Sequence, residues 1–323
     1  MQPRARARAL GRAGAAVLLV SAALACRSTP AGPVAPLPEG IAADVAFLAS
    51  PTLAGRATGT PGSERAAAYI ARHHERLGLA GAFPSKCVAE ASCAPSLYQR
   101  FHVQGKIGRN VGVVVPGADS ALRGEYVVVG AHYDHIGRAE WASDDPELGS
   151  AVRPGADDNA SGTAAVLELA RRLAARPPRR SVLLLHFDAE ELGLVGSRVF
   201  VDNAPVARER MVLMVNLDMV GRLRDARLTV QAPVAPAHVR AAIDQAAAGA
   251  GLRVEYSTTL DGRSDHASFV HAHVPSVALF TGFHGDYHRA TDIAARLDLR
   301  GLARVVDVAE AIVRTAGDRA ADR

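Results

Sequence analysis

The chain has 323 residues, of which 49% are hydrophobic and 22% charged, a composition typical of a folded globular protein. Its formal net charge is +4, but Arg4, Arg6, Arg8 and Arg12 lie in the first 25 residues, which hold no acid; without that segment the net charge is +4 − 4 = 0. This balance excludes a strongly basic surface, so nucleic acid is not an expected partner.

The N-terminal segment, residues 1–25, resembles an export signal peptide. Its arginine-rich start is followed by an apolar run from Ala13 to Ala25, too short for a comfortable membrane span. Two interpretations stay open. The end of the run fits an ordinary cleavage site, whereas Cys26 directly after it resembles a bacterial lipobox, although Ala23 takes the place of the usual leucine. We predict lipidation at Cys26 and an outer-membrane or periplasm-facing lipoprotein; the alternative is a soluble periplasmic or secreted protein.

The next segment, residues 26–40, is rich in Pro and Ala and suits a tether between a lipid anchor and a domain. A single domain is predicted over residues 41–318. Within it, Cys87 and Cys93 share one loop, and an exported chain permits a disulfide between them, which we predict. Two thiolates lack the partners that a zinc site built from cysteines alone would need.

Periodicity predicts helix over much of residues 41–79, interrupted by a turn-rich loop at 55–62. Further helices are predicted at about 160–175, 238–250 and 302–315. Between them lie short, continuously apolar, β-branched runs, which are typical of strands buried on both faces. The alternation predicts an α/β fold of three α/β/α layers, with a mainly parallel sheet covered by helices on both sides. The four runs are Tyr126–Gly130, Ser181–Phe187, Met211–Leu217 and Ser276–Thr281.

Each of these runs leads into acidic residues or histidines. In a parallel sheet the carboxyl ends of the strands meet at one edge, where sites form. Carboxylates that close together repel one another unless cations neutralise them. Imidazole and carboxylate ligands without thiolates suit Zn²⁺. The clusters are His132–His135, Asp188–Glu191, Asp218 and His284–His288, with a fifth at residues 155–162 before a predicted helix.

These clusters resemble the motifs of the M28 family of zinc peptidases, which includes bacterial aminopeptidases with two co-catalytic zinc ions. The motifs occur in the family's order between about residues 43 and 298. The resemblance implies a mixed, mainly parallel sheet between helices, a zinc-exopeptidase type of fold. The matching segments are Gly130-Ala131-His132-Tyr133-Asp134, Gly155-Ala156-Asp157-Asp158-Asn159-Ala160-Ser161-Gly162, Phe187-Asp188-Ala189-Glu190-Glu191, Asn216-Leu217-Asp218-Met219 and Tyr287-His288.

Carried over by position, the resemblance implies two Zn²⁺ per chain. His132 and Asp218 would bind one ion, Glu191 and His288 the other, and Asp157 would bridge them. Two Zn²⁺ give +4, the three carboxylates −3, and one bridging hydroxide brings the total to zero. A cis peptide at Asp157–Asp158, as in relatives, is a further expectation.

The resemblance also implies that Glu190 is the general base, taking a proton from a metal-activated water and returning it to the leaving amine. Asp134, two residues after His132, is expected to orient that imidazole. Asp292 is a candidate for the same role at His288. Weaker candidates for substrate binding are Asp265, His266 and Tyr287. The histidines at positions 135, 271, 273 and 284 are expected to be structural or to face solvent, and His73 and His74, on a predicted helix, are expected at the surface.

The predicted function is therefore a zinc-dependent exopeptidase, an aminopeptidase acting on the N-terminal residues of peptides. Alternatives on the same fold are a glutaminyl cyclase, which uses one zinc, a carboxypeptidase, and a peptidase-like binding protein without activity. Peptides are the expected partners, and membrane contact is expected only through an N-terminal lipid. The preferred residue and the oligomeric state do not follow from the sequence.

Overall fold

A computed structural model describes residues 40–85, 94–232, 235–257 and 262–320. Cys26, Cys87 and Cys93 lie outside these ranges, so the lipid anchor and the disulfide stay predictions. None of the described helices is long and apolar enough to cross a membrane. The element bounds are α1 Ile41–Leu48, α2 Pro61–Arg76, β1 Ala80–Gly81, β2 Tyr98–Val103, β3 Lys106–Val115, β4 Tyr126–His132, α3 Gly162–Ala175, β5 Ser181–Phe187, α4 Val195–Asp202, β6 Met211–Leu217, β7 Arg227–Gln231, α5 Ala237–Gly249, β8 Arg253–Ser257, α6 His266–His271, β9 Ser276–Phe280 and α7 Leu299–Asp318.

One mixed sheet organises the unit Leu37–Arg323, with the strand order β1-β3-β5-β4-β6-β9-β7-β8 and β2 paired to β3. The central strands β5, β4, β6 and β9 run parallel to one another. They are the four apolar runs of the sequence, so the predicted α/β fold with a mainly parallel sheet is confirmed. At both flanks the direction changes, because β3 is antiparallel to β5 and β7 is antiparallel to β9.

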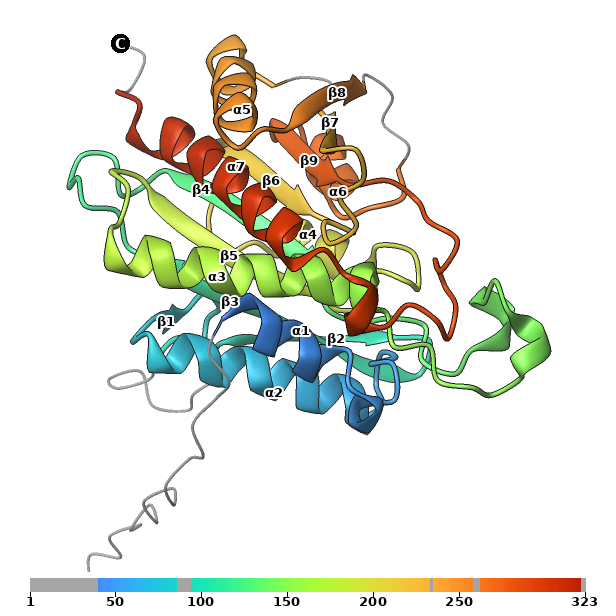
Figure 1. The fold of residues 1–323 in the computed structure, drawn as a ribbon. Coiled ribbons are helices and arrows are strands. Elements are labelled where there is room, and N and C mark those ends of the chain that lie inside the picture. The colour runs from blue at the N-terminus through green and yellow to red at the C-terminus, as the bar shows by residue number, and fades with distance from the viewer. Residues whose placement is uncertain (1–39, 86–93, 233–234, 258–261, 321–323) are drawn as a thin grey trace, which may run out of the picture. The chain divides into compact units, whose positions relative to one another are not determined.

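Helices cover both faces of the sheet (Figure 1). The central strands are buried on both sides, which explains their continuous apolar sequences. Alternate strand residues such as Val127 and Val129 pack with α3, α5 and α7 on one face. Their neighbours, such as Val128 and Leu183, pack on the other face with Phe200 of α4 and Phe269 of α6. The three α/β/α layers expected from the sequence are therefore present.

Local signals set several helix starts. Thr60 caps α2 by accepting a hydrogen bond from the backbone N–H of Ser63 at 3.3 Å, and Pro61 stands at the first helical position, where no N–H is needed. Asp298 caps α7 in the same way through the N–H of Gly301. The turn-rich loop expected around residues 55–62 separates α1 from α2.

Candidate metal centre and active site

Several elements bring titratable side chains to the carboxyl edge of the sheet. His132 ends β4, Glu190 and Glu191 follow β5, and Asp218 follows β6. Asp158 lies in the irregular turn Ala156–Ser161 that leads into α3. The sequence-predicted convergence of strand ends is therefore seen, and it gathers the side chains into two adjoining clusters.

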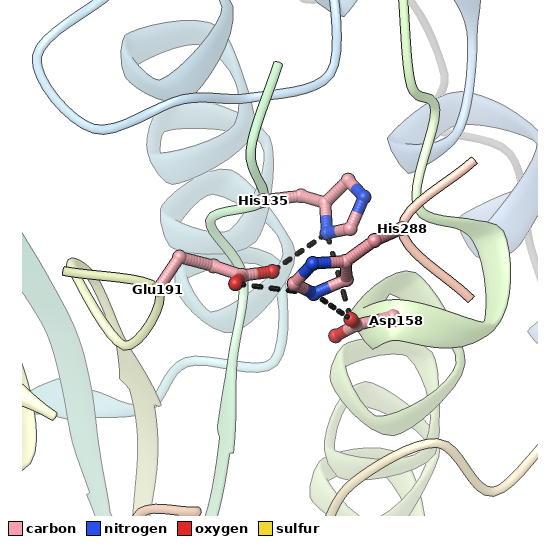
Figure 2. Close-up of side chains that lie close together, drawn as sticks. All are labelled: His135, Asp158, Glu191 and His288. Carbon is pink, nitrogen blue, oxygen red and sulfur yellow. Dashed lines mark hydrogen bonds and ion pairs between the residues drawn. The ribbon is translucent and has the colours of Figure 1, made fainter. Parts of the chain in front are cut away.

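The first cluster consists of His135, Asp158, Glu191 and His288, which point toward one another (Figure 2). The Nε2 atom of His288 lies 3.1 Å from Oδ2 of Asp158 and 3.3 Å from Oε2 of Glu191. The Nδ1 atom of His135 lies 2.8 Å from the other oxygen of Glu191. His288 Nε2 is buried yet has no partner in hydrogen-bond geometry. A ring nitrogen directed between two carboxylates in this way fits a cation there.

The second cluster consists of His132, Glu190 and Asp218. The Nε2 atom of His132 lies 3.3 Å from Oδ1 of Asp218 and 3.4 Å from Oδ1 of Asp158. Asp158 therefore directs one carboxylate oxygen toward each cluster, since its Oδ2 faces His288. Its carboxylate is the natural bridge between the two groups.

This geometry corrects the sequence-based prediction for Asp157. One oxygen of the Asp157 carboxylate accepts a hydrogen bond from the N–H of Gly221 at 2.7 Å, and the other lies 3.1 Å from Nε2 of His284. The Asp157 carboxylate thus stabilises the turn Ala156–Ser161 through contacts outside the two clusters, and the Asp158 carboxylate lies between the clusters. The cis peptide is likewise shifted by one residue, since it is Asp158–Asn159.

Asp292 holds the turn that presents Asp158. Its Oδ2 accepts hydrogen bonds from the backbone N–H groups of Asp157 and Asp158, at 2.9 and 3.2 Å. The candidate role of Asp292 at His288 is therefore wrong, because Nδ1 of His288 instead lies 2.7 Å from the carbonyl oxygen of Ala142. That contact places the Nδ1 proton of His288 and leaves Nε2 to face the cluster.

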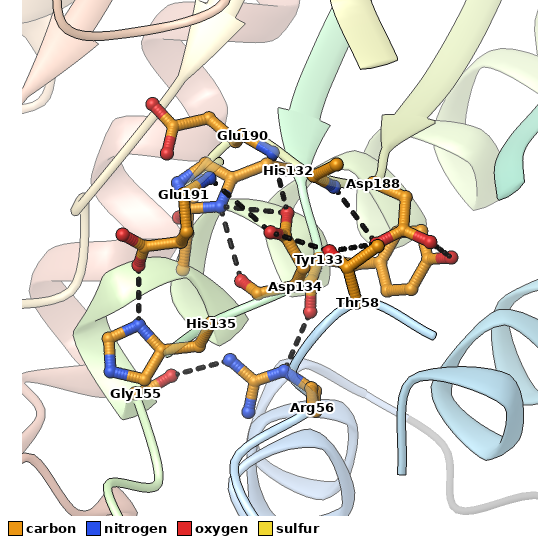
Figure 3. Close-up of polar contacts among 12 residues, drawn as sticks. Arg56, Thr58, His132, Tyr133, Asp134, His135, Gly155, Asp188, Glu190 and Glu191 are labelled. Atoms are coloured by element: carbon orange, nitrogen blue, oxygen red, sulfur yellow. Dashed lines mark hydrogen bonds and ion pairs between the residues drawn. The ribbon is translucent and has the colours of Figure 1, made fainter. Parts of the chain in front are cut away.

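Asp134 links the two halves of the site (Figure 3). Its carboxylate accepts from the backbone N–H of Glu190 at 3.1 Å and of Glu191 at 3.3 Å. His132 Nδ1 lies 3.2 Å from the main-chain oxygen of Asp134 but 3.7 Å from its carboxylate. Asp134 therefore orients His132 mainly through its carbonyl group, whereas its carboxylate fixes the backbone that carries Glu190 and Glu191.

Charge in the clusters favours bound cations. Burial raises the pKa of Glu190 well above its usual range, and the charge of Glu191 adds to this. Burial alone would lower the pKa of His288, but the carboxylates of Asp158 and Glu191 outweigh it and raise that pKa to about 11. Burial also opposes protonation of His132, yet the acids around it raise its pKa well above 6.5. The same field that holds protons on these imidazoles attracts metal cations.

A pocket beside the clusters has about 560 Å³ of free space, counting the part open to solvent. Two of the three candidate substrate residues line it: His266, and Tyr287, whose ring stacks on His288 with a centroid distance of 3.9 Å. Asp265 is not among the lining residues and is fully buried, and burial raises its pKa to about 7. The apolar part of the lining comes from Met219, Ala278, Leu279, Phe280 and Phe283.

The model of peptidase family M28 matches residues 110–313, well over half of the chain. The chain belongs to peptidase family M28. It is 30% identical over 215 residues to "Leupeptin-inactivating enzyme 1" of Streptomyces exfoliatus, covering 65% of this chain and 44% of that protein. It is also 30% identical over 212 residues to the "Probable lipoprotein aminopeptidase LpqL" of Mycobacterium tuberculosis, covering 54% of this chain and 39% of that protein. The chain spans less than half the length of these relatives.

Solved structures share the fold. A Zn-dependent exopeptidase from Parabacteroides distasonis superimposes with a TM-score of 0.68 at 20% identity, covering 86% of this chain and 99% of that one. Porphyromonas gingivalis glutaminyl cyclase gives a TM-score of 0.68 at 19% identity, covering 84% and 96%. The shared fold therefore extends over most of the chain.

The site of this M28 chain includes histidines that the sequence did not single out. His135 was expected to be structural or to face solvent, but it is 1% exposed and contacts Glu191. His284, expected in the same class, contacts Asp157. His73 and His74 were predicted at the surface and are buried; His74 lies 3.1 Å from the ring of His186, Nε2 to Nε2. A single histidine carries no pattern of residue types that marks it as buried, whether it lies in a loop, as His135 does, or on helix α2, as His74 does.

Arg56 is a further residue that sequence reasoning missed. Its guanidinium is fully buried and donates to the carbonyl oxygens of Leu48, Tyr133, Pro154 and Gly155, at 2.6–2.9 Å. Figure 3 shows the contacts with Tyr133 and Gly155. It thereby ties the loop after β4 to the turn before Asp158. Burial lowers the pKa of Arg56 to about 10, opposed by the nearby carboxylates of Asp158 and Asp134. The arginine thus remains a cation below the acidic clusters.

Gly155 explains why the acidic turn can pack so closely. Its φ is +60°, and a Cβ there would lie 2.1 Å from the carbonyl oxygen of Asp158 and 2.5 Å from the ring of His135. Only glycine accommodates both the backbone conformation and the approach of these two residues.

Proposed function

We propose that this chain is a zinc aminopeptidase that uses two metal ions. The observation that carries the proposal is the carboxylate of Asp158, which faces His132 with one oxygen and His288 with the other. His132 and Asp218 would hold one ion, Glu191 and His288 the second, and Asp158 both. The donor set, imidazole nitrogens and carboxylate oxygens, is one that zinc prefers. His135, in contact with Glu191, would orient that ligand.

Bound zinc would lower the pKa of a water and polarise the scissile carbonyl group. Glu190 would accept a proton from that water and return it to the departing amine. Its backbone is fixed twice, by the hydrogen bond to Asp134 and by its neighbour Glu191. Burial of the Glu190 carboxyl, whose pKa is raised, suits a group that must both take and give a proton. Tyr287, stacked on His288, would form one wall of the peptide site.

Action at the N-terminus is favoured by the charge of the pocket. Its lining includes the carboxylates of Asp158, Glu190, Glu191 and Asp218 but, among the described residues, a single guanidinium, that of Arg263. The two ions would neutralise Asp158, Glu191 and Asp218, which leaves the carboxylate of Glu190 to attract the ammonium group of a peptide and to repel a C-terminal carboxylate. The names of the aminopeptidase relatives support the same choice over a carboxypeptidase or a glutaminyl cyclase.

Zinc-loaded protein is expected to release the N-terminal residue from free peptides and to leave N-acetylated copies of the same peptides intact. Elemental analysis of that protein should give close to two zinc ions per chain, and a chelator should abolish activity. Mass spectrometry of the products checks the reaction. Cleavage of the acetylated copies from the C-terminus would instead identify a carboxypeptidase, and a single zinc per active chain would contradict the two-metal site.

Export is the second part of the proposal. Cys26 after the apolar segment supports a lipid-modified N-terminus, as does a relative named as a lipoprotein aminopeptidase. The mature protein from a bacterial host is expected to fractionate with membranes and to carry acyl chains on Cys26, whereas Cys26→Ser should release it into the soluble fraction. Intact-mass measurement decides: a mature chain that starts elsewhere, or an unmodified Cys26, removes the anchor.

A further inference from the structure

Two amide side chains stand at the floor of the pocket. Asn216 is on β6 and Gln231 ends β7, and both lie beside Ala278 of the intervening strand β9. Residues paired across strands project from the same face of a sheet. The floor is therefore a row of amide, methyl and amide groups, and the small Ala278 leaves room between the two amides.

The orientation of the Asn216 amide follows from its neighbours. The hydroxyl of Ser264 donates to Oδ2 of Asp218 at 2.6 Å, since an ionised carboxylate only accepts. Ser264 must therefore accept from Asn216, and Nδ2 of Asn216 is the donor, at 2.7 Å. The Asn216 side chain is 1% exposed, and its Oδ1 has no hydrogen-bond partner.

Oε1 of Gln231 is a second buried acceptor without a hydrogen-bond partner. Both oxygens are already closed to water, so an apolar substrate side chain would leave them unpaired, whereas a donor group would supply the missing hydrogen bonds. A carboxylate side chain has no donor to offer them. A lysine or arginine side chain would bring a second cation to a pocket that already holds Arg263.

We infer that the pocket selects peptides whose N-terminal side chain ends in a carboxamide, glutamine or asparagine. Its NH₂ group offers two donors, one for Oδ1 of Asn216 and one for Oε1 of Gln231. Its methylene groups contact Met219 and Phe280. This inference rests on the proposed function, because it assigns the pocket to the side chain of the residue that is released.

The test compares pairs of peptides that differ only at the first residue. Glutamine and methionine have side chains of similar length, so the ratio of kcat/KM for Gln-peptides to that for Met-peptides measures the contribution of the amide group. We expect this ratio to be about tenfold or more. Gln231→Leu should reduce this ratio about tenfold by improving methionine and weakening glutamine. Gln245→Leu, the same change at an exposed position of α5, should leave the ratio unaltered.

Binding gives a readout independent of turnover. Calorimetric titration of zinc-loaded protein should show tighter binding of free L-glutamine than of free L-methionine. In Gln231→Leu the two affinities should be equal or their order reversed. Equal or tighter binding of methionine by the unmodified protein would overturn the inference while leaving peptide hydrolysis standing. Loss of ammonia from Gln-peptides, with the peptide bond intact, would show cyclisation and would overturn the proposed hydrolysis itself.

Discussion

Glu190→Gln is expected to lower kcat by about 10²–10⁴-fold while both zinc ions stay bound. Glutamine has nearly the same volume as glutamate, and no metal position in the proposed site depends on the lost charge. KM should change little, because the groups that hold the substrate remain. Steady-state kinetics together with elemental analysis of the variant check both halves of this expectation.

Glu191→Gln is the matched comparison, because the same chemical change is made one residue away. Glu191 faces both His288 and His135, so its loss removes an anionic ligand. One zinc ion should then bind weakly or be lost, and added zinc should partly restore the rate. If Glu190→Gln lost zinc while Glu191→Gln kept both ions, Glu190 would be the metal ligand and Glu191 the candidate base. Full activity of Glu190→Gln would rule out Glu190 as the base.

The central sheet was predictable because its strands are buried on both faces. A run such as Ser181–Phe187 is apolar at nearly every position, and the structure gives β5 the same bounds. The strands that flank the central four were not predicted; they are β1, β2, β3, β7 and β8. The exposed positions of β2 and β8 carry polar side chains, as in Tyr98–Val103, so these two strands lack the continuous apolar signal.

Motif order located the candidate site, but not the residue that stands between its two clusters. Asp157 and Asp158 are adjacent and chemically identical, so no pattern of residue types distinguishes them. What does so is the turn Ala156–Ser161, in which the non-helical backbone of Asp158 turns its carboxylate toward the clusters. Arg56 illustrates the same limit, because an arginine in a turn-rich loop reads as a surface residue until the carbonyl groups that surround it are known.

Asp158→Asn and Asp157→Asn are therefore expected to differ sharply. In the proposed site Asp158 is the ligand shared by both ions, so Asp158→Asn should weaken binding of both by at least about 100-fold and abolish measurable peptide hydrolysis at limiting zinc.

Asp157→Asn should retain both zinc ions and most of the activity. An asparagine carbonyl can still accept from the N–H of Gly221, but its NH₂ group would face the protonated Nε2 of His284, because Nδ1 of that ring accepts from the backbone N–H of Asp286. Its expected cost is limited to stability, about 1–3 kcal/mol for the altered buried contact. Zinc titration and thermal unfolding of the two variants separate these effects. If Asp157→Asn lost zinc while Asp158→Asn kept both ions, Asp157 and not Asp158 would be the bridging ligand.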